Sequence, residues 1–367
     1  AVGGVLLDAF NWHYVFFMSV PIAVIGIMLA AVFMPAAARK GPLPAFDWAG
    51  LILVISFISC TLTGLSSGLR EGWGAPIIAL LFSIAIISFV AFILWELQTQ
   101  NPILQLRVFF NRKFAAAVVV GMVLSVGLFG SAYIIPLFVQ AVQGYSPTRS
   151  GLLLMPSGIL MMAMFPIAGR LSDRLPGYQM IVLGLAVFGA SCVLMMQAHT
   201  DTPFWVFVVW ITIGRIGLAT MMPPLTVTAV STLKPDLLSQ GSGALNFSRQ
   251  FGGAVGVNVL ALILGERTAF FYDAFTGLQT PDNSATLHLM SQFSHILGQL
   301  GWPLEMMPAG ALYLVGRSIH TQASMMAFSD AFLFMAALYF MTVIPALFLM
   351  DLPIKTKFRT KLRLRHG

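Results

Sequence analysis

Residues 114–139 read FAAAVVVGMVLSVGLFGSAYIIPLFV and contain no charged side chain. A bilayer core about 30 Å thick needs about 20 consecutive apolar residues in a helix, and this run is long enough to cross it. The run also lacks the strict alternation of a membrane strand. Because lipid offers no hydrogen-bond partners to an open backbone, the run indicates a transmembrane helix.

Eight further runs of similar length and character lie on both sides of this one. They cover residues 14–33, 48–68, 75–95, 150–168, 178–197, 204–222, 246–265 and 325–350. The sequence therefore predicts nine transmembrane helices in an all-α polytopic membrane protein. The opening residues 1–7, AVGGVLL, are apolar but too short to span, and we expect them to be the end of another helix.

The overall composition excludes several classes of function. Of the 367 residues, 58% are hydrophobic and 9% charged, whereas soluble proteins are about 45–50% apolar and about 25% charged. A soluble enzyme, a disordered chain and a nucleic-acid binder are therefore excluded. Cys60 and Cys192 both lie inside apolar runs, so no disulfide framework or metal cluster is expected. The sequence contains no HExxH motif, no GxSxG motif in a nucleophile setting and no paired intramembrane aspartates, so we expect neither an enzyme nor a metal site.

The distribution of Lys and Arg predicts the orientation. If nine spans alternate sides, most of the 20 Lys and Arg residues fall on one side, and Arg215 and Arg249 fall within spans. The other side carries only Arg70, Arg149, Arg267 and Arg317. By the positive-inside rule the basic side is cytoplasmic, and the basic tail 351–367 ends there. We therefore interpret the net charge of +7 as a topology signal.

The longest stretch between spans, residues 266–324, falls on the outer side. Apolar residues at helical spacing between Leu287 and Leu300 predict a short helix lying on the outer membrane face or over the mouth of the protein. His288 and His295 lie on this helix, but we find no further ligands at metal-binding spacing.

Three segments carry a resemblance to a known family. The first is YIIPLFVQAVQGYSPTRSGLLLMPSG at 133–158 with GRLSDR at 169–174, and the second is NFSRQFGGAVG at 246–256. The third is the opening pair Gly3 and Gly4, followed by WHYVFFMSVPI. Together they resemble the major facilitator superfamily, specifically its 14-helix drug:proton antiporters of the EmrB/QacA type.

The resemblance implies a partial major facilitator fold, truncated at its N-terminus, with nine complete helices and the end of a tenth. Residues 1–33 would then end an incomplete N-terminal six-helix bundle. Residues 34–113 would form an extra central helix pair with cytoplasmic linkers. Residues 114–350 would form a complete C-terminal six-helix bundle, including the outer loop 266–324, and residues 351–367 would form the cytoplasmic tail.

The resemblance also implies a cytoplasmic gate motif between the second and third helices of the C-terminal bundle. Its residues are Gly169, Arg170, Asp173, Arg174 and Gly177. We expect the glycines to permit tight turns and the carboxylate to lie favourably before the next helix. The arginines could pair with acids or backbone ends of a neighbouring helix and so form a latch. The alternative is a solvated loop that only sets topology.

The start of the eighth span carries residues for helix packing and for the gate. They are Asn246, Arg249, Gln250, Gly252, Gly253 and Gly256. Gly252 and Gly256 form a G-x-x-x-G pair that permits close helix approach. We expect Arg249 to snorkel to the inner interface or to make a charge contact between bundles at the gate.

Four residues are candidates for the substrate cavity or for coupling. Arg215 lies near the middle of a span, where a charge is costly, so it must face the bundle interior, a water-filled cavity or a partner. Tyr133 and Gln140 lie seven residues apart and could present one polar, aromatic side toward a central cavity. Asp330 could be proton-linked, although its place near the outer interface favours a cap or a loop contact.

The resemblance implies a secondary transporter that exports amphipathic or cationic compounds in exchange for protons by alternating access. The implied partners are such small substrates, the lipid bilayer and a periplasmic adaptor protein, with no nucleic acid. No cofactor is expected beyond the proton gradient, and the proton-binding acids are expected on helices that precede this sequence. Two alternatives stay open: a remnant or scaffold without transport activity, and an exporter of lipids or metabolites.

Overall fold

The computed structural model describes residues 2–9, 11, 13–33, 46–280 and 282–350, and this part of the chain contains only helices as regular structure. Nine of its helical segments are long and apolar enough to cross a membrane, which confirms the predicted number. They are His13–Phe33, Trp48–Glu71, Pro76–Gln98, Arg112–Ala141, Pro147–Ser172, Gly177–Met195, Phe204–Ser231, Leu238–Gly277 and Leu304–Leu347. The expected tail 351–367 and most of the linker, residues 34–45, lie outside the described residues.

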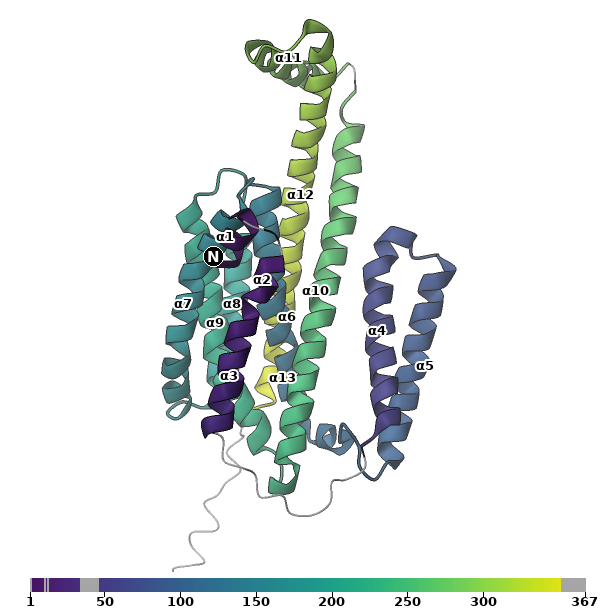
Figure 1. Cartoon of the computed structure of the whole chain (residues 1–367), viewed down its shortest axis with the longest axis vertical. Coiled ribbons are helices and arrows are strands. Elements are labelled where there is room, and N and C mark those ends of the chain that lie inside the picture. Colours follow the sequence, from purple (N-terminus) through teal and green to yellow (C-terminus); the bar gives the residue numbers. More distant parts are fainter. Residues whose placement is uncertain (1, 10, 12, 34–45, 281, 351–367) are drawn as a thin grey trace, which may run out of the picture.

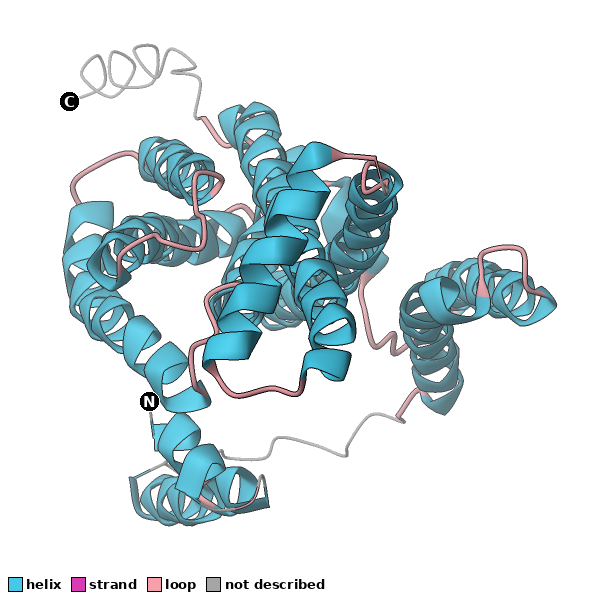
Figure 2. Ribbon diagram, turned by 90° about the horizontal axis from the view of Figure 1, so that it is seen from above, coloured by secondary structure: helices cyan, strands magenta, loops and turns pink. Residues whose placement is uncertain are grey.

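Six of these helices pack together as a bundle (Figures 1 and 2). The bundle consists of α6 (Arg112–Ala141), α7 (Pro147–Ser172), α8 (Gly177–Met195), α9 (Phe204–Ser231), α10 (Leu238–Gly277) and α12 (Met307–Met341), followed by the short α13 (Val343–Leu347). Its core is one continuous cluster of buried side chains that includes Phe138, Phe207, Phe328 and Tyr339. The aromatic rings of Phe207 and Phe328 contact that of Phe138 from two sides, at centroid distances of 5.6 and 5.2 Å.

The helix pair α4 (Trp48–Glu71) and α5 (Pro76–Gln98) stands beside this bundle and packs against α10 through α4 (Figure 1). The ring centroids of Phe57 on α4 and Phe251 on α10 lie 5.3 Å apart. At the end that the charge distribution predicts to be the outer one, and that is called outer below, the indole nitrogen of Trp73 donates a hydrogen bond of 2.8 Å to Glu266. The short 3-10 helix η1 (Leu106–Phe110) connects α5 to α6.

The first three helices lie at another edge of the bundle, next to α7 (Figure 2); they are α1 (Val2–Ala9), α2 (His13–Phe17) and α3 (Ser19–Phe33). α1 packs against the beginning of α7, where Gly4 lies so close to Pro147 that a Cβ would stand 2.6 Å from its carbonyl oxygen. The backbone N–H of Thr148 donates a hydrogen bond of 2.9 Å to Asp8. α3 has no buried residue. The described N-terminal segment is therefore attached to the bundle mainly through α1.

The outer stretch 266–324 is largely helical, which corrects the expectation of a loop. α10 continues to Gly277 and contains 40 residues, so it is about 60 Å long. α12 begins at Met307, and both helices extend beyond the outer ends of the other helices (Figure 1). The expected short helix is present as α11 (Ser284–Gln299), with Asn283 as its N-cap. It packs against α12 at the tip of this extension and not on the outer face of the bundle.

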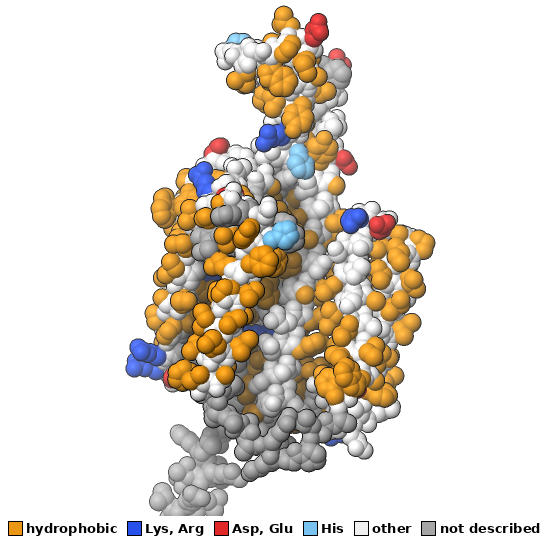
Figure 3. All heavy atoms as spheres, in the orientation of Figure 1, with side chains coloured by type: hydrophobic (Ala, Val, Ile, Leu, Met, Phe, Trp, Pro, Cys, Tyr) orange, Lys and Arg blue, Asp and Glu red, His pale blue; other side chains and the backbone are white. Residues whose placement is uncertain are grey.

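The surface agrees with a membrane environment. In Figure 3 hydrophobic side chains cover the sides of the molecule, and charged side chains gather toward its two ends. Large apolar residues are exposed on the helices that face outward, for example Ile86 and Ile87 on α5 and Ile27 on α3. Lipid can cover such side chains without cost, so the chain is an integral membrane protein.

Candidate functional site

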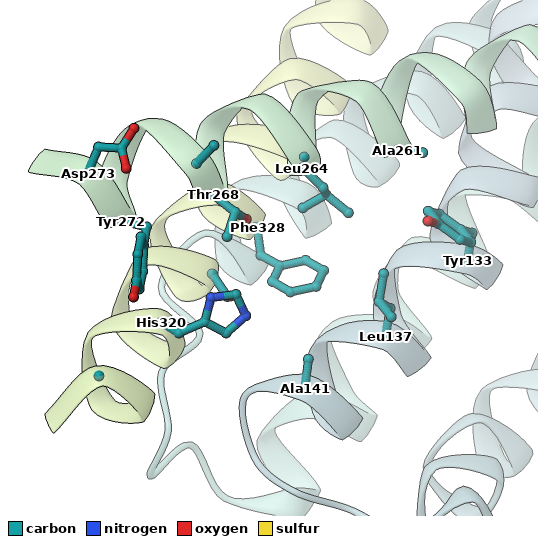
Figure 4. Close-up of a pocket in the computed structure, with 14 residues that line it drawn as sticks. Tyr133, Leu137, Ala141, Ala261, Leu264, Thr268, Tyr272, Asp273, His320 and Phe328 are labelled. Atoms are coloured by element: carbon teal, nitrogen blue, oxygen red, sulfur yellow. The ribbon is translucent and has the colours of Figure 1, made fainter. Parts of the chain in front are cut away.

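A cleft of about 660 Å³ opens between the outer halves of α6, α10 and α12 (Figure 4). Its volume is typical of sites for small molecules. Leu137 and Tyr133 of α6 form one wall, and residues of α10 and α12 face them from the other side. Gly316 leaves open room along α12, since nothing lies within 4 Å of a Cβ at this position, whereas Gly265 of α10 makes room for Leu69 of α4.

Aromatic rings supply much of the lining. Tyr133 is 37% exposed and presents its ring to the space, while the ring of Phe328 points into it from a buried position on α12. Toward the outer end, Tyr272 of α10 meets His320 of α12 edge to face, with 6.0 Å between the ring centroids. Such rings can hold flat apolar groups or the positive charge of a ligand against their faces.

Few polar groups line the cleft, and one of them is a carboxylate. Asp273 is exposed, and within the described residues it forms neither an ion pair nor a hydrogen bond. The imidazole of His320 points toward the middle of the space, and Thr268 and Ser324 add hydroxyl groups. The arrangement combines an apolar, aromatic interior with one uncompensated negative charge at its edge, which favours an amphipathic ligand that carries a positive charge.

The structure separates the two predicted residues of α6. Tyr133 lines the cleft, but Gln140 does not. The amide of Gln140 instead donates a hydrogen bond of 3.5 Å to the hydroxyl of Ser150 at the start of α7.

Arg215 lies apart from the cleft, inside the bundle. It borders a small cavity of about 10 Å³, space for about one water molecule, together with Ser131 of α6, Ser191 of α8 and Met335 of α12. No described carboxylate pairs with it. The buried hydroxyl of Tyr339 lies close enough to interact with its charge and donates a hydrogen bond of 3.2 Å to the carbonyl of Leu124. Arg215 therefore faces the bundle interior, one of the three surroundings that its position required.

Asp330 forms neither a cap nor a loop contact, which corrects that expectation. It lies inside α12 and forms an ion pair of 2.5 Å with Arg267 of α10. The guanidinium of Arg267 also lies 4.7 Å from the ring centroid of Phe271. The pair joins the two long helices on a different side from the cleft, because its residues line another hollow with Leu333 and Phe334. The pair thus links α10 to α12 and places a positive charge beside the Asp330 carboxylate.

The predicted gate motif spans the end of α7 and the beginning of α8. Gly169 lies inside α7 and not in a turn, and Asp173 is the C-cap of α7 and does not cap α8, which begins at Gly177. Arg170 and Arg174 are exposed and form no ion pair within the described residues, so the latch stays a prediction. Gly177 has a clear steric role, because a Cβ there would stand 2.6 Å from the hydroxyl of Thr228 on α9.

The glycines of α10 lie where this helix packs closest to α6. Added Cβ atoms at Gly252 and Gly256 would stand 2.7 Å from Met122 and 2.6 Å from Val126, and Gly253 lies against the ring of Phe129. Gly3, at the other end of the chain, has only Val15 nearby.

Arg249, near the start of α10, points into the bundle. Its side chain passes Gly121 of α6, and one guanidinium nitrogen donates a hydrogen bond of 3.4 Å to Thr226 of α9. Another guanidinium nitrogen is buried without a partner. Asn246 and Gln250, which flank it in sequence, are exposed.

Sequence reasoning missed the residues at the outer end of the cleft. Tyr272, Asp273 and His320 all fall in the stretch 266–324 that was expected to be a loop. The signal was present, because residues 266–277 contain neither a proline nor an internal glycine to end the helix of α10. Sequence reasoning also missed Asp47 and Glu96, which face each other at the inner end of the pair α4 and α5.

Comparison with known proteins adds a family match and several relatives. A family model described as Major Facilitator Superfamily matches residues 1–257. The chain is 27% identical over 366 residues to the uncharacterized MFS-type transporter YhcA of Bacillus subtilis, which covers 98% of this chain and 68% of that protein. The multidrug transporter protein MdtP of Bacillus subtilis is 29% identical over 73% of this chain and 49% of its own length.

Two further matches are a sequence relative and a solved structure. The colistin resistance protein EmrB of Acinetobacter baumannii is 26% identical over 95% of this chain and 68% of its own length. A bacterial homolog of the human lysosomal transporter Spinster, solved in an inward-facing and occupied conformation, aligns with a TM-score of 0.42 and 15% identity, over 82% of this chain and 68% of that one. The chain thus spans between about half and two thirds of the length of these relatives.

Proposed function

Because the chain belongs to the major facilitator superfamily, we propose that it forms part of a secondary transporter that exports amphipathic or cationic compounds in exchange for protons. In such a protein two helix bundles rock against each other and expose a central site alternately to the two sides of the membrane. Since the chain spans only part of the length of its relatives, the proposal concerns the whole transporter to which this bundle belongs.

The cleft between α6, α10 and α12 carries this proposal. A ligand with a flat apolar body can pack between Tyr133 and Phe328, and its positive charge can lie toward Asp273 and the edge of Tyr272. The names of the relatives MdtP, a multidrug transporter, and EmrB, a colistin resistance protein, support the same class of substrate.

The charge distribution supports an orientation with the cleft toward the outside. Arg112, Arg170 and Arg174 all lie at the end of the bundle where α6 begins and α7 ends, whereas the cleft lies at the opposite ends of these helices. By the positive-inside rule the basic end faces the cytoplasm of a bacterial inner membrane, and the C-terminus lies there too. A ligand in the cleft would then be close to its point of release.

The test is efflux of a fluorescent organic cation such as ethidium by the complete transporter, reconstituted in vesicles with an imposed proton gradient. We expect Asp273→Asn to raise KM for ethidium by up to about fivefold, because an exposed ion pair contributes up to about 1 kcal/mol. Asp282→Asn is the matched control, since it removes the same charge from an exposed position beyond α10 that does not line the cleft.

Three results would count against this function. Efflux that continues unchanged after the proton gradient is collapsed would exclude proton coupling. Equal transport of a neutral compound of similar size, with no effect of Asp273→Asn on either compound, would indicate a different substrate class such as a lipid or a metabolite. No transport of any compound by the complete protein would favour a scaffold.

A further inference from the structure

The helix pair α4 and α5 holds two acidic side chains at the end next to η1. Asp47 is the N-cap of α4, and Glu96 lies in the last turn of α5. Because the two helices are antiparallel neighbours, the start of one lies beside the end of the other. Both acids are more than nine-tenths buried, with 8% of Asp47 and 4% of Glu96 exposed.

Each carboxyl group has one oxygen that accepts hydrogen bonds and one that does not. Asp47 Oδ1 accepts a hydrogen bond of 2.9 Å from the backbone N–H of Gly50 and another of 2.9 Å from the indole N–H of Trp95. Glu96 Oε1 accepts a hydrogen bond of 3.4 Å from the backbone N–H of Leu104. The second oxygens, Asp47 Oδ2 and Glu96 Oε2, are buried without a partner.

The two carboxyl groups meet at Gly50. A Cβ added to this glycine would collide with Asp47 Oδ2 and would lie 3.2 Å from Glu96 Oε1, so the missing side chain leaves the space in which both acids fit. The two groups are close enough that the Asp47 carboxylate repels a negative charge on Glu96. Within the described residues no ion pair reaches either acid, and Arg107, the basic residue of η1, is exposed.

Keeping two buried carboxylates ionised without a cation costs much free energy, because each charge is desolvated and each repels the other. One proton held between them removes one charge and turns an unpartnered oxygen into a donor. Asp47 is the partner better suited to keep its negative charge, since two N–H groups and the N-terminus of α4 stabilise it. The proton would then belong to the pair as a unit.

We propose that Asp47 and Glu96 form a proton-binding site that holds one proton per chain at neutral pH. The site goes beyond the proposed function, because it lies outside the six-helix bundle and away from the cleft. It lies where α5 continues through Leu104 and η1 into α6. Loss of the proton would place two negative charges side by side at this junction and would weaken the attachment of the helix pair to the bundle.

Infrared spectroscopy of the purified chain in lipid nanodiscs tests the proposal directly. At neutral pH we expect the carbonyl stretch of one protonated carboxylic acid, which disappears in Glu96→Gln and in Asp47→Asn. Both variants keep the local structure, because glutamine retains an acceptor for Leu104 and asparagine is a good N-cap. Asp282→Asn, which changes an exposed acid, should leave the band unchanged.

The pH dependence of unfolding gives a second readout that a purely structural pair would not affect. A folded pair that holds a proton more tightly than the unfolded chain loses stability as the pH rises and the proton leaves. The melting temperature of the wild-type chain should therefore fall on the alkaline side of neutrality, and Glu96→Gln should lack this part of the fall.

Two results would overturn the site. A wild-type chain without a protonated acid at neutral pH, or with one that survives Glu96→Gln, would show that the pair does not share a proton. A band that emerges only after sodium or calcium ions are removed would show that a metal cation neutralises the pair in place of a proton.

Discussion

Helices α6 and α4 are both uncharged over most of their length, but the surroundings that they meet are very different. In the most apolar stretch of α6, 67% of the residues are buried inside the protein, against 17% in the corresponding stretch of α4. α6 contacts α10 through glycines at backbone distance, whereas α4 contacts the same helix through aromatic rings such as Phe57 against Phe251. Hydropathy alone cannot distinguish the two, because lipid and protein interior are equally apolar.

The comparison implies that the bundle depends on shape, and that the helix pair depends on a few contacts near the membrane surfaces. Lipid can replace most of the neighbours of α4, but it cannot enter the space between α6 and α10. Substitutions at the two interfaces of α10 should therefore differ strongly in effect.

The largest effect is expected for Gly252→Val in α10. The new side chain would stand 2.7 Å from the Cβ and 2.8 Å from the Cα of Met122, so the backbones of α6 and α10 must separate. Overpacking of this kind costs about 1–3 kcal/mol or more, and we expect a clear fall in melting temperature in detergent. Gly243→Ala is the control on the same helix, since nothing lies within 4 Å of a Cβ at that position. Equal stability of the two variants would contradict the close packing of α6 and α10 at Gly252.

A smaller effect is expected for Tyr339→Phe in the centre of the bundle. This change removes the buried hydrogen bond from the hydroxyl to the carbonyl of Leu124 and leaves that acceptor unpaired. We expect a loss of about 1–2 kcal/mol in the free energy of unfolding, measured by denaturation in mixed micelles. Tyr313→Phe, at an exposed position of α12, should be neutral.

A still smaller effect on global stability is expected for Phe57→Ala in α4. The ring contacts both Phe89 and Phe251, and such aromatic pairs contribute about 0.5–1.5 kcal/mol each, part of which lipid replaces. We expect the melting temperature to change little while the helix pair detaches more readily from α10. A disulfide between Leu69→Cys and Gly265→Cys, in a chain without its native cysteines, would then form in lower yield.

The smallest effect is expected for Trp73→Phe in the turn between α4 and α5. It removes one exposed hydrogen bond to Glu266 and keeps the apolar contact of the ring with Gly68, so the cost should be below about 1 kcal/mol. The measurement is the same disulfide yield, which should fall less than in Phe57→Ala. A larger fall than in that variant would show that the surface contact, and not the aromatic contact, attaches the helix pair.

The spans were predictable because long uncharged runs have only one stable form in lipid, and all nine are present. The extension of α10 and α12 was not predictable. Hydropathy identifies the part of a helix that lies in lipid, but it does not detect the part that continues beyond the membrane surface. Residues such as Tyr272 and His320 therefore stayed hidden in an expected loop.

The partners of the charged residues were the least predictable feature. Arg267 and Asp330 pair across 63 positions of the sequence, and Asp47 and Glu96 meet only because two helices turn back on each other. A single sequence places such residues at depths in the membrane, but it does not show which helices are neighbours. The position of Tyr133 on one side of α6 agrees with its place in the lining of the cleft, whereas Gln140, expected on the same side, contacts Ser150 of α7 instead.

The long helix α10 also acts as a lever. Its middle section lies against α6, and its outer section forms a wall of the cleft and one leg of the extension that carries α11. A tilt of about 10° would move the end of a segment about 30 Å long by about 5 Å. Small changes at the cleft are thereby magnified at the tip, so a spectroscopic label on α11 would report motions of α10 that are difficult to resolve inside the membrane.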